Sequence, residues 1–424
     1  MDAKTDPSAI SHLPDLAWPP AGVSDSVPFG VFTDQVTYDL EQERVFRPTW
    51  NYLALEAEIP NAGDYKSTFL GDTPVVVTRD TEGEIHAWVN RCAHRGAMVC
   101  RENQGNNADG TYTCVYHQWA FDAKGDLIGV PFRRGLGGKG GYPKDFDMKE
   151  HGLQKVRVEN YHGLIFGTFN EDLVDVEGFL GGEGDVSYHM KRILNRPLKV
   201  LGHTRQFVDS NWKIYAENTK DPYHASLLHL FHMTFGLYRS SQVGGVSLGD
   251  EWHSVLFASA GEEDESTKKE NKENAARTYQ EGYTLADMSL LAGRKEYDDG
   301  VTLVILSIMP SLVVQQIQNT LAVRQILPKG VDKFELVWTY FGYDDDDAEM
   351  DAIREKQVNL IGPAGLISME DGEACELVQN AIIRDRDTRS CIQMSGHDFK
   401  DEPHLVTEGP VRSFWNRYRL LMDF

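Results

Sequence analysis

Cysteine and positive charge are both scarce in this chain. Its 424 residues include only 5 cysteines, an odd and small number that does not support a disulfide framework. The 42 Lys and Arg are outnumbered by 65 Asp and Glu, so the net charge is −23. A charge of this sign argues against nucleic acid or an anionic membrane surface as a partner.

Long apolar runs and internal repeats are also missing. The longest apolar stretch, Val301 to Val314, is interrupted by Ser307, Pro310 and Ser311, and it is shorter than the ~20 residues that a spanning helix needs. Residues 1–20 contain no apolar segment typical of a secretory signal. We therefore expect a cytoplasmic, reduced protein with no membrane span, and its length predicts two or three domains.

The pattern along the chain changes twice. Residues 1–38 are punctuated by Pro and Asp and predict an extended arm, while Tyr38–Leu53 has helical spacing. Short strand patterns between glycine-rich turns follow up to residue 169. The remainder is mixed, with helical stretches and strand runs such as Leu312–Gln318. This order predicts an α+β protein with a small β-rich part before a larger mixed part.

Two short clusters near residue 100 combine thiols with imidazoles. They read Cys92-Ala93-His94 and Cys114-Val115-Tyr116-His117. Two Cys for one iron and two His for the other form the ligand set of a Rieske [2Fe–2S] centre. The alternative is a zinc site, but zinc fingers pair ligands of one type in C-x₂₋₄-C and H-x₃₋₅-H. Because each pair here mixes the two types, the spacing favours the iron–sulfur cluster.

A second candidate metal site lies about 100 residues further on. His224 and His229 follow Asp221, but five residues of a regular α-helix turn through roughly 140°. A distorted or π-type turn is therefore needed to bring the two rings together. The segment from Gly362 ends in Glu370 and Asp371, and one of these acids can complete the 2-His-1-carboxylate triad of non-haem Fe(II) oxygenases. The competing interpretation is an ordinary helix with one buried and one exposed His.

Together these motifs resemble the large (α) subunit of Rieske non-haem iron aromatic-ring-hydroxylating oxygenases over essentially the whole chain. The C-x-H…C-x₂-H motif matches at Cys92, His94, Cys114 and His117, and N-x-x-D-x-Y-H-x₄-H matches from Asn218 to His229. The resemblance places the iron ligands at His224, His229 and Asp371, with Glu370 as the alternative to Asp371.

The resemblance also implies an architecture. Residues 1–41 would form an N-terminal arm and helix start that pack on the catalytic domain. Residues 42–169 would form a small all-β Rieske domain, inserted before a catalytic non-haem iron domain, 170–424, whose antiparallel sheet is covered by helices. Asp221 would link His224 to the cluster His of a neighbouring subunit in an α3β3 assembly with a small β subunit.

The implied activity is hydroxylation of an aromatic carboxylic acid with O₂. Electrons from NADH would arrive through a ferredoxin reductase and a ferredoxin. Within the family the chain resembles the salicylate 5-hydroxylase branch, which converts salicylate to gentisate, and this is the expected reaction. A cis-dihydroxylating dioxygenase of a benzoate- or anthranilate-like acid is the alternative, and a non-catalytic electron carrier or zinc-binding protein is a more distant one. Lys and Arg outnumber acids between Trp88 and Asp145. This basic region either docks an acidic redox partner or reflects a chance unevenness in the distribution of charge along the chain.

Substrate contacts are predicted by position alone. We expect an apolar pocket with a few polar anchors, and the candidates are Asn218, His232, Met309 and Gln316. Gln316 interrupts an apolar strand pattern and needs a buried partner, which is either the substrate or a neighbouring strand. Arg324 is a possible carboxylate clamp that can equally face solvent.

Overall fold

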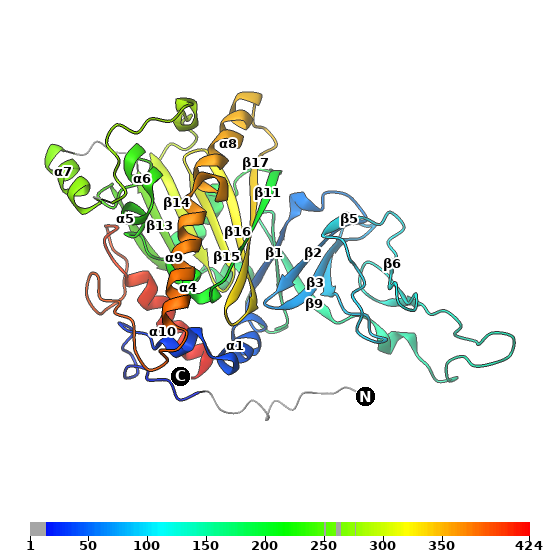
Figure 1. Cartoon of the computed structure of the whole chain (residues 1–424). Helices are drawn as coiled ribbons and strands as arrows, with labels where there is room; N and C mark the ends of the chain where they lie inside the picture. Colours follow the sequence, from blue (N-terminus) through cyan, green and yellow to red (C-terminus); the bar gives the residue numbers. More distant parts are fainter. Residues whose placement is uncertain (1–13, 250–251, 260–263, 276) are drawn as a thin grey trace. The chain divides into compact units, whose positions relative to one another are not determined.

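The computed structural model describes residues 14–249, 252–259, 264–275 and 277–424. The chain divides into two compact units. The small unit is Phe46–Val176, and the large unit combines the chain up to Val45 with Glu177–Phe424. The beginning of the predicted arm, residues 1–13, lies outside the described residues. Figure 1 traces both units along the sequence.

The small unit is built from antiparallel strands. A seven-stranded sheet has the order β1-β10-β9-β4-β3-β2-β5, and a three-stranded sheet has the order β6-β7-β8. Its core gathers aromatic side chains, among them Trp88, Tyr112 and Trp119, around Cys92 and Cys114. The strands are β1 (Asn51–Leu55), β2 (Asp64–Leu70), β3 (Thr73–Arg79), β4 (Ile85–Val89), β5 (Gln104–Asn106), β6 (Tyr112–Thr113), β7 (Ala120–Phe121), β8 (Leu127–Gly129), β9 (Lys155–Tyr161) and β10 (Leu164–Thr168).

The large unit contains one antiparallel sheet of seven strands in the order β11-β17-β16-β15-β14-β13-β12. The apolar run from Val301 forms two of these strands, joined by a turn. Their bounds are β11 (Leu198–Val208), β12 (Gly244–Gly249), β13 (His253–Ser259), β14 (Val301–Ile308), β15 (Leu312–Ile317), β16 (Thr320–Gly330) and β17 (Lys333–Tyr343).

Helices of the large unit lie against both faces of this sheet. On one face, Tyr215 of α4 hydrogen-bonds Arg324 of β16; on the other, Arg192 of α3 hydrogen-bonds Gln316 of β15. Figure 1 shows α4 and α9 running in front of β15 and β16. The helices are α1 (Gln35–Glu41), α3 (Asp185–Ile193), α4 (Trp212–Asn218), α5 (Ala225–Leu228), α6 (Leu230–Phe235), α7 (Glu265–Asn274), α8 (Ala348–Ile361), α9 (Ile367–Ile382) and α10 (Gly409–Met422), and α2 (Val176–Phe179) lies at the sequence boundary between the units.

The structure confirms the predicted α+β class but not every predicted helix. The expected helix Tyr38–Leu53 is wrong beyond Phe46: α1 is followed by a π-helical turn, Gln42–Phe46, and β1 begins at Asn51. Pro48 explains the stop, because proline has no N–H to donate and disfavours a helical residue before it. Among the described residues, no helix combines the length and the apolar character needed to cross a membrane.

Candidate metal centres and active-site pocket

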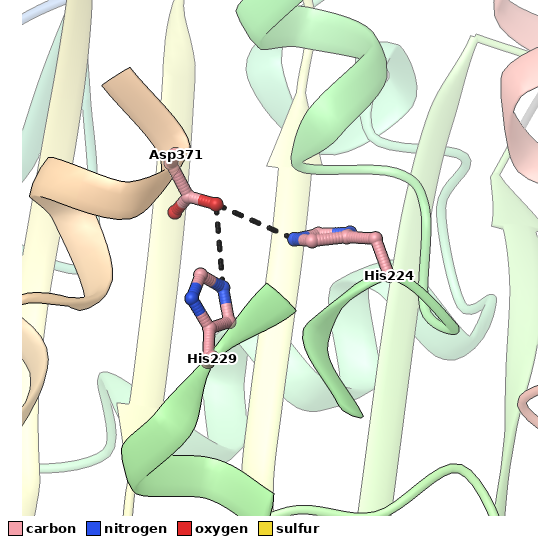
Figure 2. Close-up of side chains that lie close together, drawn as sticks. All are labelled: His224, His229 and Asp371. Atoms are coloured by element: carbon pink, nitrogen blue, oxygen red, sulfur yellow. Dashed lines mark ion pairs between the residues drawn. The ribbon is translucent and has the colours of Figure 1, made fainter. Parts of the chain in front are cut away.

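Three side chains converge in the large unit to form a candidate mononuclear metal site. His224 Nε2 lies 3.4 Å and His229 Nε2 lies 3.3 Å from Asp371 Oδ1. Figure 2 shows both rings pointing at this carboxylate. Among the described residues this is the only group of three or more His, Cys, Asp or Glu whose ligand atoms all lie within 4.8 Å. Glu370, the alternative acid, is not in the group.

A break between two short helices brings the histidines together. His224 caps the start of α5, and His229 ends α5 and precedes α6 with an extended backbone, φ −89° and ψ 110°. Of the two turns considered from the sequence, the structure has the distorted one and not the π-type one. On a continuous α-helix the side chains of His224 and His229 would point about 140° apart. Because the backbone of His229 is not helical, its ring can turn toward the same point as that of His224.

Each histidine presents the same nitrogen to the site. His224 Nδ1 lies 2.6 Å from the Asp221 carbonyl oxygen, and His229 Nδ1 lies 2.7 Å from Glu370 Oε2. These acceptors hold the proton on Nδ1 and leave Nε2 as the metal-binding lone pair. The chemistry of the donor set therefore fits a mononuclear Fe(II), and Glu370 orients His229.

Electrostatics keep the third ligand ionised. Burial acts to raise the pKa of Asp371, but the charges and hydrogen bonds of His229 and His224 outweigh it and hold this pKa well below its usual value. Asn218 Nδ2 also donates to Asp371 Oδ1 at 3.0 Å. Asn218, which the sequence predicted as a substrate contact, lines the pocket. Its side chain is hydrogen-bonded to the candidate ligand Asp371.

One face of the sheet walls a pocket beside this triad. Leu256, Leu303, Ile305 and Ile317 supply apolar side chains, and Arg324 is the only Lys or Arg among the described lining residues. The register pairs Leu256 with Ile305, Leu303 with Ile317, and Ile305 with Gln315. Because side chains alternate along a strand, these residues share a face.

Two predicted substrate contacts lie elsewhere. Gln316 is on the opposite face of β15 from Ile317; its side chain accepts from Arg192 at 2.6 Å and donates to the Gln318 carbonyl at 3.0 Å. Neighbouring elements therefore satisfy it, as the competing interpretation expected. Met309 is buried and is not among the lining residues.

Arg324 is a buried cation with neutral partners. Its residue is 6% exposed; Nε donates to Gln315 Oε1 at 2.6 Å and Nη1 to the Tyr215 hydroxyl at 2.9 Å. Among the described residues no carboxylate forms an ion pair with it, and its guanidinium lies 4.7 Å from the Trp338 ring centroid. The guanidinium charge is thus available to an anion in the pocket.

His232 also lines the pocket, but it lies outside the triad. Burial, together with the charge of His229, holds the pKa of His232 well below its usual value. The imidazole is therefore neutral near pH 7.

The small unit pairs the four predicted cluster ligands. The Cys92 and Cys114 thiols are in hydrogen-bonding contact, and burial raises the pKa of Cys92. The His94 and His117 ring centroids are 4.5 Å apart. A single zinc ion requires its four ligand atoms to surround one point. The four ligand atoms here do not form one compact group of the kind found at the triad. Two pairs are what a two-iron cluster needs.

The two cluster loops close in the same way. The Cys92 carbonyl accepts the N–H of Gly96, and the Cys114 carbonyl accepts the N–H of Gln118, both at 2.9 Å. The two residues whose N–H groups donate, Gly96 and Gln118, both have positive φ, 78° and 56°. His94 stacks on Trp119 with centroids 4.9 Å apart, and its Nδ1 is buried without a partner among the described residues. Such an orphaned nitrogen fits a metal ligand.

Lys220, for which the sequence predicts no role, is buried next to Asp221. Its Nζ donates to the Trp252 carbonyl, Ser254 Oγ and the Ser307 carbonyl at 3.2–3.4 Å. Burial lowers the pKa of Lys220 to about 7. No feature of the sequence distinguishes Lys220 from an exposed Lys, because its burial results from the sheet that packs over it.

This buried amine predicts a pH dependence of stability. From about pH 7 to the unfolded pKa of 10.5 the unfolded chain binds a proton that the folded chain has lost, so stability rises with pH. Wild type should therefore gain more stability than Lys220→Met between pH 7.5 and 9.5, by on the order of 3 °C in Tm. Thermal unfolding of both proteins at the two pH values checks this; equal gains would contradict it.

Comparison with known proteins agrees with this geometry. Residues 49–142 match the model of the Rieske [2Fe-2S] domain, and residues 180–423 match that of the ring hydroxylating alpha subunit (catalytic domain). The small unit thus contains the domain that binds a [2Fe–2S] cluster, and the large unit the domain that binds a mononuclear iron.

Curated relatives match over nearly the whole chain. The anthranilate 1,2-dioxygenase large subunit of Burkholderia cepacia is 52% identical, over 94% of this chain and 93% of the relative. The terephthalate 1,2-dioxygenase terminal oxygenase component subunit alpha 2 of Comamonas sp is 48% identical, over 93% and 94%. The salicylate 5-hydroxylase large oxygenase component of Ralstonia sp is 40% identical, over 96% of each.

A solved structure shares the fold. Naphthalene 1,2-dioxygenase from Rhodococcus sp., bound to indole, superposes with a TM-score of 0.76 at 22% identity and covers 94% of each chain. The family models, the relatives and this fold together identify the chain as a large (α) subunit of the ring-hydroxylating oxygenases that carry a Rieske domain.

Proposed function

We propose that this large subunit hydroxylates an aromatic carboxylic acid. Arg324 is the observation that carries the proposal, because a nearly buried guanidinium without a carboxylate partner lines the pocket beside the triad. Leaving a buried charge unpaired is costly, and a planar guanidinium matches a carboxylate in a two-pronged ion pair. A benzoate-like acid supplies that carboxylate, and its ring fits the apolar wall.

Each metal group has a proposed set of protein ligands. Cys92 and Cys114 would hold one iron of the cluster, and His94 and His117 the other, while His224, His229 and Asp371 would hold the mononuclear iron. When bound, the cluster supplies single electrons and the mononuclear iron supplies the site for O₂. Arg324 orients the acid toward the triad, and the apolar wall excludes water from the ring.

The electron route is proposed on the basis of the family. Electrons from NADH would pass through a ferredoxin reductase and a ferredoxin, and the basic segment between Trp88 and Asp145 would attract an acidic ferredoxin. Asp221 would connect His224 to the cluster of a neighbouring subunit. The geometry around His224 supports this, since both the carbonyl and the carboxylate of Asp221 lie beside it. A small β subunit completing α3β3 remains part of the proposal.

The comparisons support an anthranilate-like acid over salicylate as the first candidate substrate. The higher identity to the anthranilate relative, 52% against 40%, favours dioxygenation of an anthranilate-like acid. Salicylate hydroxylation to gentisate, the expectation from the sequence, is the second candidate and rests on the salicylate 5-hydroxylase relative. Terephthalate receives less support as a substrate, because it has two carboxylates. Arg324 is the only Lys or Arg among the described residues that line the pocket.

Turnover with labelled oxygen tests the reaction. Anthranilate, salicylate, terephthalate and benzoate are each supplied with ¹⁸O₂, NADH, a reductase and a ferredoxin, and products are identified by mass spectrometry. Dioxygenation of anthranilate predicts two oxygens from one O₂ in the initial product, whereas gentisate formation predicts one in the product and one in water. Failure of every aromatic acid to turn over or bind would overturn the proposed function.

The Arg324→Met variant should lose affinity for carboxylates selectively. Removing a charge-assisted ion pair costs about 2–3 kcal/mol, so Kd for benzoate rises about 30- to 150-fold. Benzamide, which carries no charge, should bind both proteins equally. Calorimetric titration measures both ligands. Met309→Leu, a change of similar volume outside the pocket lining, serves as the matched control, and an unchanged benzoate Kd in Arg324→Met would contradict the clamp.

A further inference from the structure

A second polar group in the pocket is not explained by the metal site. His232 lies on α6, three residues after His229, and the two rings are neighbours. The His232 ring centroid is 5.0 Å from that of His229 and 5.8 Å from that of Tyr238. The residue is 3% exposed and lines the pocket with Arg324. His232 is therefore a buried wall residue next to the triad.

Both ring nitrogens of His232 are buried without a hydrogen-bond partner among the described residues. Other polar groups of the lining are paired: Asn218 donates to Asp371, Tyr238 donates to the Pro222 carbonyl, and the Thr219 hydroxyl donates to the Ala216 carbonyl. A buried polar group without a partner is destabilising. Since His232 is not in the triad, a metal does not satisfy it.

The missing partner can be described chemically. A neutral imidazole offers one N–H donor and one nitrogen acceptor. A hydroxyl or an amino group on the ligand can give its hydrogen to that acceptor, while a methyl group or a hydrogen cannot. The position follows from the proposed 1,2-dioxygenation, with Arg324 holding the carboxylate. In that reaction the ring carbon next to the carboxylate is itself a reacting carbon and faces the triad, so its substituent would come within reach of His232, whose ring centroid is 5.0 Å from that of His229 in the same pocket.

Building on the proposed function, we propose that His232 selects benzoates that carry a hydroxyl or amino group on the carbon next to the carboxylate. The substrate class is then 2-hydroxy- and 2-aminobenzoates, and the unsubstituted acid is a poor substrate. A site with a buried group that needs a partner rejects the analogue that lacks it more strongly than an apolar pocket discriminates by size.

Binding to the wild-type holoenzyme tests this without any substitution. Salicylate and anthranilate are compared with 2-methylbenzoate, whose methyl group has nearly the same size but cannot donate a hydrogen bond, and with benzoate. Calorimetric Kd values should be about 10- to 100-fold lower for salicylate and anthranilate than for 2-methylbenzoate, and kcat/KM should follow the same order. Equal Kd values for the three ortho-substituted acids would overturn the proposal.

Two substitutions assign the effect to the imidazole. His232→Phe keeps an aromatic ring of similar shape without hydrogen-bonding atoms, so the ratio of the 2-methylbenzoate Kd to the salicylate Kd should fall to about 1. His232→Asn retains an acceptor and should restore part of that ratio. Iron content is measured alongside, and Kd is compared at matched iron content because the ring neighbours His229. A wild-type ratio in His232→Phe would overturn the role of His232.

Failure of this inference is distinguishable from failure of the proposed function. Acids that bind in an Arg324-dependent manner, but with no preference for the ortho donor, would leave the carboxylate clamp in place and remove the role of His232. Absence of binding by every aromatic acid would remove both.

Discussion

Asp371→Ala should lose the mononuclear iron and keep the [2Fe–2S] cluster. Iron content is then expected to fall from about three atoms per chain to about two, and hydroxylation should drop by more than about 1,000-fold. The reason is geometric: Asp371 Oδ1 lies 3.3–3.4 Å from both histidine Nε2 atoms, and without it only the two imidazoles remain as ligands. The visible absorbance of the cluster should be unchanged. Metal analysis and absorbance together check both halves of this result.

Glu370→Gln is the matched control for Asp371→Ala. The change removes the charge next to His229 Nδ1 but keeps an oxygen that can accept its hydrogen. Loss of such a supporting partner typically weakens metal affinity by about 10- to 100-fold. Glu370→Gln should therefore retain iron at high iron concentration and lose it first on chelation. If Asp371→Ala kept all its iron while Glu370→Gln lost it, the third ligand would be Glu370.

Asp221→Ala should keep both metal centres and still stop turnover. The hydrogen bond that fixes His224 goes from Nδ1 to the backbone carbonyl of residue 221, and this substitution leaves the carbonyl in place. Iron content should accordingly stay near three atoms per chain. The carboxylate, by contrast, is the proposed link to the neighbouring cluster, and steady-state hydroxylation should fall by about 100-fold or more.

Rapid mixing locates the lesion in Asp221→Ala. Enzyme with a reduced cluster is mixed with O₂ and substrate, and reoxidation of the cluster is followed by its absorbance. Slow reoxidation with unchanged substrate Kd would place the defect in electron transfer, whereas weakened substrate binding would point to a distorted pocket. Wild-type turnover in Asp221→Ala would remove the proposed link altogether.

The sequence predicted the metal chemistry better than the pocket. Each cluster ligand pair and the histidine pair are local patterns, so their spacing alone indicates coordination. The resemblance to the family placed the acid near the histidines at Asp371, although it is distant from them in the sequence, with Glu370 as the alternative. Whether Glu370 or Asp371 points inward was left open, since only the helix orientation of α9 distinguishes neighbouring residues.

Side-chain direction on the sheet explains why Gln316 lies away from the pocket beside the triad. Gln315 and Gln316 are adjacent in β15 but face opposite sides; Gln315 holds Arg324, while Gln316 binds Arg192. An apolar strand with two consecutive glutamines gives no indication of which one faces the pocket. Likewise, the burial of Arg324 depends on β15, β17 and α4, whose packing is not encoded near residue 324.

The two sides of the pocket come from different parts of the large unit. The candidate iron ligands belong to α9 and to the segment around α5, whereas the apolar wall belongs to β13, β14 and β15. Replacing Leu303, Ile305 or Ile317 therefore reshapes the space for the ring without touching a metal-binding atom. Such a division allows substrate range to diverge by mutation while the oxygen chemistry is inherited intact, and it marks these three wall positions as the places to start in redesigning the enzyme for other aromatic acids.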